Sequence, residues 1–469
     1  MENNVLTRKP RIGLLGLITD GYEQVFPGIL ARQKKHGEAI ASVLRSSMDV
    51  VFDDIGANQT KIEEIVGSYN RMKLDGILIV LLAYSQGAWL IRAMKENKLP
   101  VALAVIQPDT IADEEFEEFD LTINQGIHGA QDNCNVMMRL GMSYQVYAGD
   151  FNSQGFKSFV LDFAKAAQTC AELKKMRIGV IGRMQGMGDI LTDEMALFRK
   201  FGIEICHDSL GCVYSHMQSL ESQEIVAETI ADHSRFSIDE QLSEESHGIA
   251  VSEYVGFKKY LEENKYAAFT AHFDVFGQDG RFRQLPLYAA SRLMADGYGY
   301  SAEGDIVCAA MVRAGHVLSG APANFTEMYM MDDKTESILF CHAGEGNYMS
   351  ADVGKKPRLI DRYLGEGGLE NPPTIMFIPK PGKATLASMV SVGGEHFRLI
   401  VAKGEILDND SMHRCEMPYF FFRPDSGVKS CVEGWLRLGG THHEVICTGD
   451  MTHRWNMLCD MLGVEYREV

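Results

Sequence analysis

A regular alternation of buried strands with helices is the feature that most restricts the fold of this chain. Residues 76–83 form a continuous apolar run, Gly-Ile-Leu-Ile-Val-Leu-Leu-Ala, and residues 11–18 form a similar one. Such runs, without polar alternation, are typical of parallel strands that helices cover on both faces. Helix-compatible stretches occupy 26–44 and 61–73, and a further strand is expected at 100–106. The pattern predicts an open, doubly wound parallel sheet.

The alternation starts again near residue 176. A long helix is expected to end at about 175, and residues 176–182 (Met-Arg-Ile-Gly-Val-Ile-Gly) then form a fresh buried strand. Before this boundary, residues 120–124 are expected to form a strand. After it, the polar residues 235–245 are expected to form a surface loop. We therefore predict a second α/β domain of the same kind.

The pattern changes after about residue 321. Apolar and polar residues alternate at 335–340, 383–390 and 395–402, with turns such as Gly393-Gly394 between them, as in antiparallel sheets. The predicted fold class is α/β, with two doubly wound parallel α/β domains followed by an antiparallel β-rich C-terminal domain. The predicted domains are 1–175, 176–320 and 321–469.

Charge and loop composition exclude several classes of partner. The chain has 45 basic and 64 acidic residues and a net charge of −19, which argues against nucleic acid or an anionic membrane surface. The turns of the predicted sheets lack both Gly-x-Gly-x-x-Gly and Gly-x-x-x-x-Gly-Lys-Ser/Thr, so no nucleotide is expected.

Cysteine usage and hydropathy predict a cytoplasmic location. The ten cysteines are scattered and form no Cys-x-x-Cys pair, as expected for reduced, buried thiols in a cytosolic protein. The sequence begins Met-Glu-Asn-Asn, which does not resemble a signal peptide. No apolar run approaches the roughly 20 residues that span a bilayer.

Four residues are candidates for a metal site: Glu303, Glu327, His342 and one histidine of the His442-His443 pair. Carboxylates and imidazoles together suit a divalent cation with mixed oxygen and nitrogen ligands. Simpler explanations stay open. Glu303 could favour a helix N-terminus, Glu327 could be an exposed strand residue, and His342 could be a hydrogen-bonded core histidine. The separations match no short zinc motif.

Four segments surround these residues: Gly297-Tyr-Gly…Glu303-Gly-Asp305, Phe325-Thr-Glu327-Met-Tyr329, His342-Ala-Gly-Glu345 and Gly439-Gly-Thr-His442-His443. Taken together, they resemble motifs of the L-arabinose isomerase family. The resemblance implies a metal-dependent aldose–ketose isomerase that acts on a free, unphosphorylated sugar through an enediolate. It implies Mn²⁺ ligation by Glu303, Glu327, His342 and His443, with the two glutamates as general acid and base and Glu345 orienting a ligand.

The same resemblance implies substrate-binding residues and an oligomer. His128, in Asn124-Gln-Gly-Ile-His128-Gly, is expected to reach the pocket of a neighbouring subunit in a homo-oligomer, which the resemblance implies to be a hexamer. Phe273, Tyr329 and Met187 are expected to face the substrate. Met187 has a simpler explanation as a flexible gap-filler in a chain with 25 methionines.

The sequence departs from the family where the substrate would be recognised. Residues 17–23 read Leu-Ile-Thr-Asp-Gly-Tyr-Glu in place of Gln-His-Leu-Tyr-Gly, and Met328 replaces an aspartate. The sugar is therefore open: another pentose, a hexose or a branched sugar is compatible. Two alternatives stay beside this prediction. One is an L-fucose isomerase-type enzyme with a Glu/Asp/His metal set, and the other is a non-catalytic sugar-binding protein.

Overall fold

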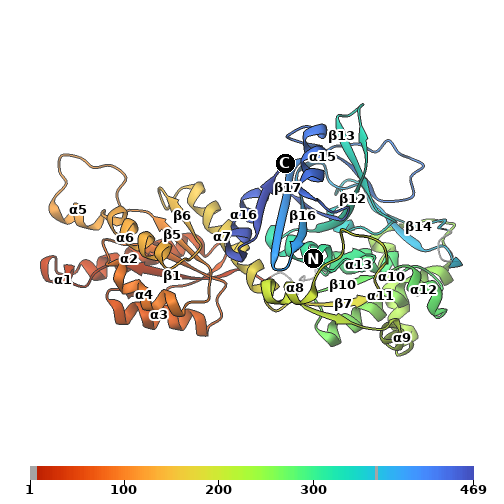
Figure 1. Cartoon of the computed structure of the whole chain (residues 1–469), viewed down its shortest axis with the longest axis horizontal. Helices are drawn as coiled ribbons and strands as arrows, with labels where there is room; N and C mark the ends of the chain where they lie inside the picture. Colours follow the sequence, from red (N-terminus) through yellow and green to blue (C-terminus); the bar gives the residue numbers. More distant parts are fainter. Residues whose placement is uncertain (1–7, 365–367) are drawn as a thin grey trace. The chain divides into compact units, whose positions relative to one another are not determined.

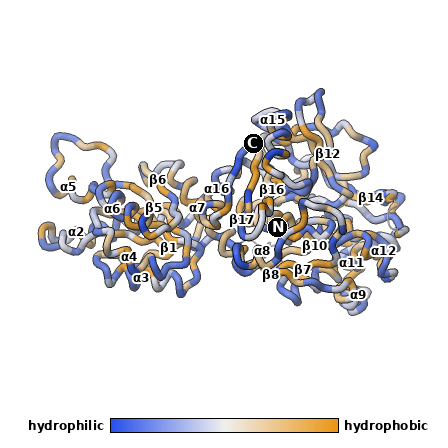
Figure 2. Tube along the Cα trace, viewed as in Figure 1, coloured by the Kyte–Doolittle hydropathy of each residue, from blue (hydrophilic) through white to orange (hydrophobic). Residues whose placement is uncertain are grey.

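The computed structural model describes residues 8–364 and 368–469, which divide into two compact units. The first unit contains residues 8–171 and 453–463, and the second contains residues 172–452 and 464–469. In both units the hydrophobic segments coincide with the strands and with one face of the helices (Figure 2). None of the described helices is both long and apolar enough to span a bilayer.

The first unit is an α/β unit built on a parallel sheet with strand order β2-β1-β4-β5-β6, to which β3 adds beside β1 (Figure 1). Its strands are β1 (Arg11–Leu17), β2 (Asp49–Val51), β3 (Ile55–Gly56), β4 (Gly76–Leu81), β5 (Val101–Val105) and β6 (Tyr144–Ala148). Its helices are α1 (Tyr22–Val25), α2 (Ile29–Leu44), α3 (Gln59–Arg71), η1 (Gly87–Trp89), α4 (Leu90–Glu96), α5 (Glu118–Ile123), α6 (Gly126–Arg139), α7 (Gln154–Leu173) and α16 (Thr452–Leu462).

The central strand β4 explains why helices cover both faces of this parallel sheet. All six of its residues are buried, so both faces need helices. One face packs against α3, α4 and α6. On the other, Gly76 leaves room for the Phe163 ring of α7, which would lie 2.9 Å from a Cβ at that position. The predicted doubly wound sheet is confirmed here.

The predicted strand at 120–124 is wrong, because these residues belong to helix α5. The helix begins with a reciprocal capping box in which the Glu117 and Asp120 side chains accept hydrogen bonds from each other's backbone N–H groups. Only five residues of alternating polarity suggested the strand, and the acidic first turn favours a helix.

The second unit contains another parallel sheet and a closed antiparallel sheet. The parallel sheet has strand order β11-β10-β7-β8. Its strands are β7 (Arg177–Ile181), β8 (Glu204–His207), β10 (Ala268–Ala271) and β11 (Gly299–Ala302). The helices of this unit are α8 (Glu194–Phe201), α9 (Leu210–Gln218), α10 (Ser222–Arg235), α11 (Glu244–Asn264), α12 (Asp274–Asp279), α13 (Leu287–Ala295), α14 (Ile306–Ser319), η2 (Tyr348–Ser350) and α15 (Val428–Leu438).

The antiparallel sheet has the order β16-β19-β12-β13-β18-β17-β20, and it closes on itself because β16 also pairs with β17. Only β20 is parallel to its neighbour, β17. The predicted antiparallel β-rich region is therefore confirmed. Its strands are β12 (Ala323–Asp332), β13 (Ser337–Cys341), β16 (Gly382–Gly393), β17 (His396–Ile406), β18 (Tyr419–Pro424), β19 (Glu444–Thr448) and β20 (Glu465–Glu468).

A small third sheet contradicts part of the predicted surface loop at 235–245. Residues Ser237–Ile238 form β9, which pairs in parallel with β14 (Arg358–Asp361), and β14 pairs with β15 (Pro373–Met376). Phe236 anchors this segment because it is buried against the Tyr348 ring, 5.0 Å away. A single buried aromatic residue in a polar stretch gave no periodic signal.

Helix α14 connects the parallel sheet to the closed sheet. Every residue from Ile306 to Leu318 is buried, as expected for a helix that is covered on all sides. It follows β11 directly and packs on that strand, while Gly315 allows close approach to Cys447 of β19. The end of β11 is thereby held beside the ends of β12, β13 and β19.

Candidate functional site

Glu303 lies in the sharp turn between β11 and α14, at the carboxyl end of the parallel sheet. Its φ is 64°, a left-handed conformation that costs a non-glycine residue roughly 1–2 kcal/mol. The next residue, Gly304, has φ 87°, and a Cβ there would lie 2.5 Å from the Cα of Arg183. Asp305, not Glu303, caps the helix, because its Oδ1 accepts hydrogen bonds from the N–H groups of Val307 and Cys308, both at 3.0 Å.

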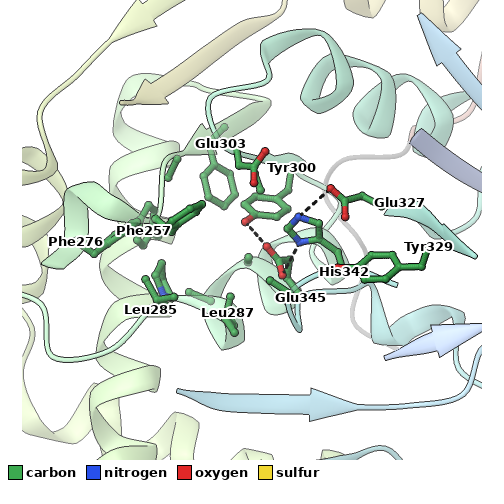
Figure 3. A pocket seen from close by; sticks show the side chains of 18 residues that line it. Phe257, Phe276, Leu285, Leu287, Tyr300, Glu303, Glu327, Tyr329, His342 and Glu345 are labelled. Atoms are coloured by element: carbon green, nitrogen blue, oxygen red, sulfur yellow. Dashed lines mark hydrogen bonds and ion pairs between the residues drawn. The ribbon is translucent and has the colours of Figure 1, made fainter. Parts of the chain in front are cut away.

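Glu327 and His342 come from neighbouring antiparallel strands. Glu327 is on β12 opposite Cys341, and His342 follows β13 by one residue. The Nε2 of His342 lies 3.5 Å from Oε1 of Glu327, and its Nδ1 lies 3.0 Å from Oε2 of Glu345 (Figure 3). The other oxygen of Glu345 accepts a hydrogen bond of 2.8 Å from the Tyr300 hydroxyl. His342 is therefore held by a buried carboxylate that is itself fixed.

The two adjacent histidines come directly before β19, which pairs with β12 so that Glu444 faces Thr326. His443 is buried, and its Nε2 lies 3.5 Å from Oε2 of Glu303 and 3.3 Å from Oε1 of Glu327. Its Nδ1 lies 3.0 Å from Oδ2 of Asp305. The Nδ1 of His443 is thus paired with the Asp305 carboxylate, and its Nε2 is directed at Glu303 and Glu327.

His442 occupies the solvent side of the same cluster. Its side chain is 36% exposed, and its Nε2 lies 3.5 Å from Oε2 of Glu303. Asp189, in the loop after β7, holds it: one carboxylate oxygen lies 2.6 Å from the His442 Nδ1 and 2.9 Å from its backbone nitrogen. Asp189 and His442 are therefore part of the site.

The cluster changes the proton affinity of its members. Burial alone would raise the pKa of Glu303, but the imidazoles of His442 and His443 outweigh burial and hold it well below its usual range. Burial would lower the pKa of His443, whereas the carboxylates of Asp305, Glu303 and Glu327 raise it well above the ordinary value. The pKa of His342 is raised mainly by Glu345, against the opposing effect of burial. The surrounding negative charge thus favours a cation.

The donor atoms fit a divalent metal ion. Three of them are buried and make no hydrogen bond among the described residues: Oε2 of Glu303 and Nε2 of His442 and His443. Ligand atoms of Glu303, His342 and His443 lie within 4.8 Å of one another, as do those of Glu327, His442 and His443. Metal–ligand distances of about 2.0–2.2 Å place two ligand atoms on opposite sides of an ion roughly 4.0–4.4 Å apart, which agrees with this spacing. A mixture of carboxylate and imidazole ligands suits a first-row divalent ion.

A cavity of about 230 Å³ opens beside these residues. Figure 3 shows the carboxylates and imidazole on one side and apolar side chains on the other. Phe273 and Tyr329, both predicted to face the substrate, line it. Met187 is half-buried in the loop after β7 and is not among the described residues that line this cavity.

His128 belongs to the first unit. It is exposed on the first turn of α6, and its ring lies 4.7 Å from that of Tyr84. The hollow around it, about 400 Å³, includes the exposed apolar residues Ile111, Leu121 and Ile127. Its expected role at a neighbouring subunit's pocket stays a prediction.

Sequence reasoning named the His442-His443 pair but gave His442 no role of its own, and it missed Asp189 and Asp305 as parts of the site. Two signals pointed to them. Asp189 ends a glycine-rich segment after a predicted parallel strand, and such strand ends are where α/β sheets carry their sites. Asp305 stands two residues after Glu303, in the position of a helix N-cap. The contact between Asp189 and His442 joins residues 253 apart in the sequence, so no local pattern could show it.

Two family models match the chain. The L-arabinose isomerase central domain matches residues 184–321, and the L-arabinose isomerase C-terminal domain matches residues 322–465. These adjoining matches contain all of the site residues described above in the second unit.

Curated relatives match over most of their length. L-arabinose isomerase of Leuconostoc mesenteroides is 25% identical over 94% of this chain and 96% of that protein. L-arabinose isomerase of Bacillus subtilis (strain 168) is 26% identical over 73% of this chain and 70% of that protein. A solved periplasmic solute-binding protein from Actinobacillus succinogenes with bound D-allose is 12% identical over 59% of this chain and 84% of that chain, and its TM-score of 0.17 is too low to bear on fold or function. The chain belongs to the L-arabinose isomerase family, a family of aldose–ketose isomerases.

Proposed function

We propose that this chain is a divalent-metal-dependent aldose–ketose isomerase that acts on a free sugar. The observation that carries the proposal is that Glu303, Glu327, His342 and His443, from separate segments of the chain, belong to two groups of ligand atoms that share His443 and lie beside a cavity. Family membership gives the reaction class, and the unsatisfied buried donor atoms support the metal.

The proposed metal ligands are Glu303, Glu327, His342 and His443, with Mn²⁺ as the expected ion. When bound, such an ion supplies Lewis-acid stabilisation of negative charge on the two sugar oxygens of an enediolate. His443 is a better candidate ligand than His442 because it is fully buried and Asp305 orients its ring. Glu345 orients His342 in the same way.

Glu303 and Glu327 are proposed to move the proton between carbon 1 and carbon 2 of the sugar. One carboxylate accepts the proton from carbon 2 of the aldose as the enediolate forms, and a carboxylic acid returns it to carbon 1. The depressed pKa keeps Glu303 ionised, which is the form that a metal ligand requires. Both carboxylates line the cavity, so they face the space where a sugar would be held.

His442 is proposed to bind a sugar hydroxyl. Its Nδ1 is fixed by Asp189, and its Nε2 lies 3.5 Å from Oε2 of Glu303 and 3.8 Å from Oε1 of Glu327. Phe273 and Tyr329 are proposed to contact the substrate from the cavity wall, and Met187 from the loop that also carries Asp189.

We further propose a homo-oligomer, expected to be a hexamer, in which His128 enters the pocket of a neighbouring subunit. The exposed apolar side chains of Ile111, Leu121 and Ile127 around His128 support an interface at this surface. The expected location is the cytoplasm. The cysteines are scattered and form no Cys-x-x-Cys pair, as is usual for thiols in a reducing compartment.

The test is to load the purified protein with Mn²⁺ and incubate it with a panel of free aldopentoses, aldohexoses and the matching ketoses in deuterated water. Interconversion with deuterium incorporation at carbon 1 or carbon 2 supports the proposal. Sugar binding without interconversion or exchange, with any divalent metal, would contradict it and favour the sugar-binding alternative.

A further inference from the structure

The cavity beside Glu303 has two chemically different sides. On one side are the carboxylates of Glu303, Glu327 and Glu345 with the imidazole of His342. Figure 3 shows that the labelled residues on the opposite side are phenylalanine and leucine. We call this side the apolar wall. It consists of Phe257 of α11, Phe269 of β10, Phe276 of α12, Leu285, and Leu287 of α13.

The apolar wall offers no polar side chain to a ligand. Along the described lining from Phe257 to Ala290, every side chain is apolar. Tyr300 stands between the two sides, but its hydroxyl already donates to Glu345. A sugar hydroxyl against this wall would lose its water partners without gaining a side-chain partner, and an unpaired buried polar group is unfavourable.

The wall is already packed in its final shape. The rings of Phe257 and Phe269 lie 5.5 Å apart, and those of Phe276 and Phe282 lie 5.2 Å apart. Phe257, Phe269 and Phe276 are at most 2% exposed. The cavity of about 230 Å³ exceeds the ~150 Å³ at which apolar protein cavities stay dry and take up apolar ligands. It can therefore receive part of a ligand without rearrangement.

We propose that the substrate of this enzyme has an apolar terminal carbon, as in a 6-deoxyaldose, and that the apolar wall selects it against the sugar with a hydroxyl at that carbon. The inference rests on the proposed function, since carbons 1 and 2 must lie at Glu303 and Glu327 for the far end of the sugar to meet the wall. A methyl group gains from burial there, whereas a hydroxyl loses hydrogen bonds. Discrimination by such a pocket is typically of the order of 10–100-fold.

The first experiment compares matched sugars that differ only at carbon 6. The pairs are L-fucose with L-galactose, L-rhamnose with L-mannose, and D-fucose with D-galactose. We expect kcat/KM for the deoxy sugar of the pair that is turned over to be about 10–100-fold higher. Equal or better turnover of the hydroxylated sugar in every pair would overturn this inference while leaving the isomerase function intact.

The second experiment changes the wall. Leu287→Gln places an amide on the wall, and Leu287→Met, which is close to glutamine in size and shape, is the apolar control. The glutamine variant should lose most of the preference and the methionine variant should keep it. If Leu287→Gln does not fold, Leu285→Gln with Leu285→Met makes the same test. An unchanged preference in a folded glutamine variant contradicts the proposal.

A binding measurement separates failure of this inference from failure of the proposed function. Alditols cannot be isomerised, so calorimetry of L-fucitol against galactitol with the Mn²⁺-loaded protein reports selection alone. Tighter binding of L-fucitol, by about tenfold or more, supports the wall's role even if no sugar in the panel is turned over. Equal affinity, or tighter binding of galactitol, overturns it.

Discussion

Two buried carboxylates at opposite ends of parallel strands show how differently the two α/β units are used. Asp75 comes just before β4 in the first unit. Its oxygens accept hydrogen bonds from the Arg8 guanidinium at 2.5 and 2.7 Å and from the backbone N–H of Arg11 at 2.8 Å. Glu303 comes just after β11 in the second unit, and its Oε2 has no hydrogen-bond partner among the described residues.

The difference teaches where to look for chemistry in similar folds. A carboxylate at the amino end of a strand that is fully hydrogen-bonded within the protein stabilises the sheet. A carboxylate at the carboxyl end, in a left-handed backbone conformation and with one oxygen that makes no hydrogen bond among the described residues, is held ready for a ligand. Both units have buried parallel sheets, so the fold alone does not distinguish them.

The largest expected effect is on turnover, when the carboxylates of the second unit's site lose their charge. Glu303→Gln and Glu327→Gln keep the side-chain size but remove a charged ligand and a proton acceptor. Turnover should fall by at least ~10²–10⁴-fold, the range for a lost general base. Deuterium exchange at carbon 2, measured with saturating Mn²⁺, checks this. Near-normal exchange in both variants would show that neither glutamate carries the proton.

Removing an imidazole ligand should lower the affinity for the metal ion more than it lowers the turnover of the metal-loaded enzyme. His342→Ala and His443→Ala each delete a proposed ligand, so Mn²⁺ affinity should fall by more than the ~10–100-fold typical of losing a residue that only orients a ligand. Calorimetric titration of Mn²⁺ is the measurement. His442→Ala is the control, because it removes the exposed neighbour and should change affinity less. If His442→Ala lowered Mn²⁺ affinity more than His443→Ala did, His442 and not His443 would be the metal ligand.

Metal binding should weaken as the pH falls. Carboxylates raise the pKa of His342 and His443, so both imidazoles are protonated below those raised values in the metal-free protein. A bound cation must displace these protons. Affinity should therefore fall about tenfold per pH unit for each proton displaced, and the fall should begin above the ordinary histidine range. Affinity that does not change between pH 6 and 8 would contradict this.

The turn that carries Glu303 should tolerate little change. Gly304→Ala adds a Cβ 2.5 Å from the Arg183 backbone in addition to an unfavourable φ of 87°. Gly280→Ala has a similar φ of 73° but open space around it, so it reports the conformational cost alone, about 1–2 kcal/mol. We expect a clearly larger drop in the thermal unfolding midpoint for Gly304→Ala. Equal drops would mean that the turn shifts freely.

The smallest effect on activity is expected at Asp75. Asp75→Asn removes charge-assisted hydrogen bonds and should destabilise the first unit by about 1–3 kcal/mol, with unchanged turnover per folded molecule. Asp54→Asn is the control, because the Asp54–Lys34 pair is exposed and such pairs contribute at most about 1 kcal/mol. Denaturant unfolding followed by tryptophan fluorescence measures both.

The sheets were predictable because their signal is local. Strand β4 is a continuous apolar run, and Gly393 and Gly394 mark the turn between β16 and β17, so these elements could be predicted from neighbouring residues. The failures were short segments, such as α5 and β9, where a capping box or one buried aromatic side chain decides the outcome. The division at residues 175 and 320 into three domains stays a prediction.

The site was predictable only in part. The motif resemblance named Glu303, Glu327, His342 and His443, which the structure places in two groups of ligand atoms that share His443, and their role as ligands stays a prediction. It did not name the residues that orient them. The orientation of His442 by Asp189 depends on tertiary contacts between distant segments, and only coordinates show it.

Helix α16 has a consequence for synthesis of the chain. It is the last helix, yet residues 453–463 belong to the first unit, where Trp455 is fully buried and Arg454 pairs with Asp162 at 2.7 Å. Translation usually lets the N-terminal part of a protein fold first. Here the first 171 residues leave the ribosome without the helix that completes their unit. That unit stays incompletely covered until residues 453–463 have been synthesised.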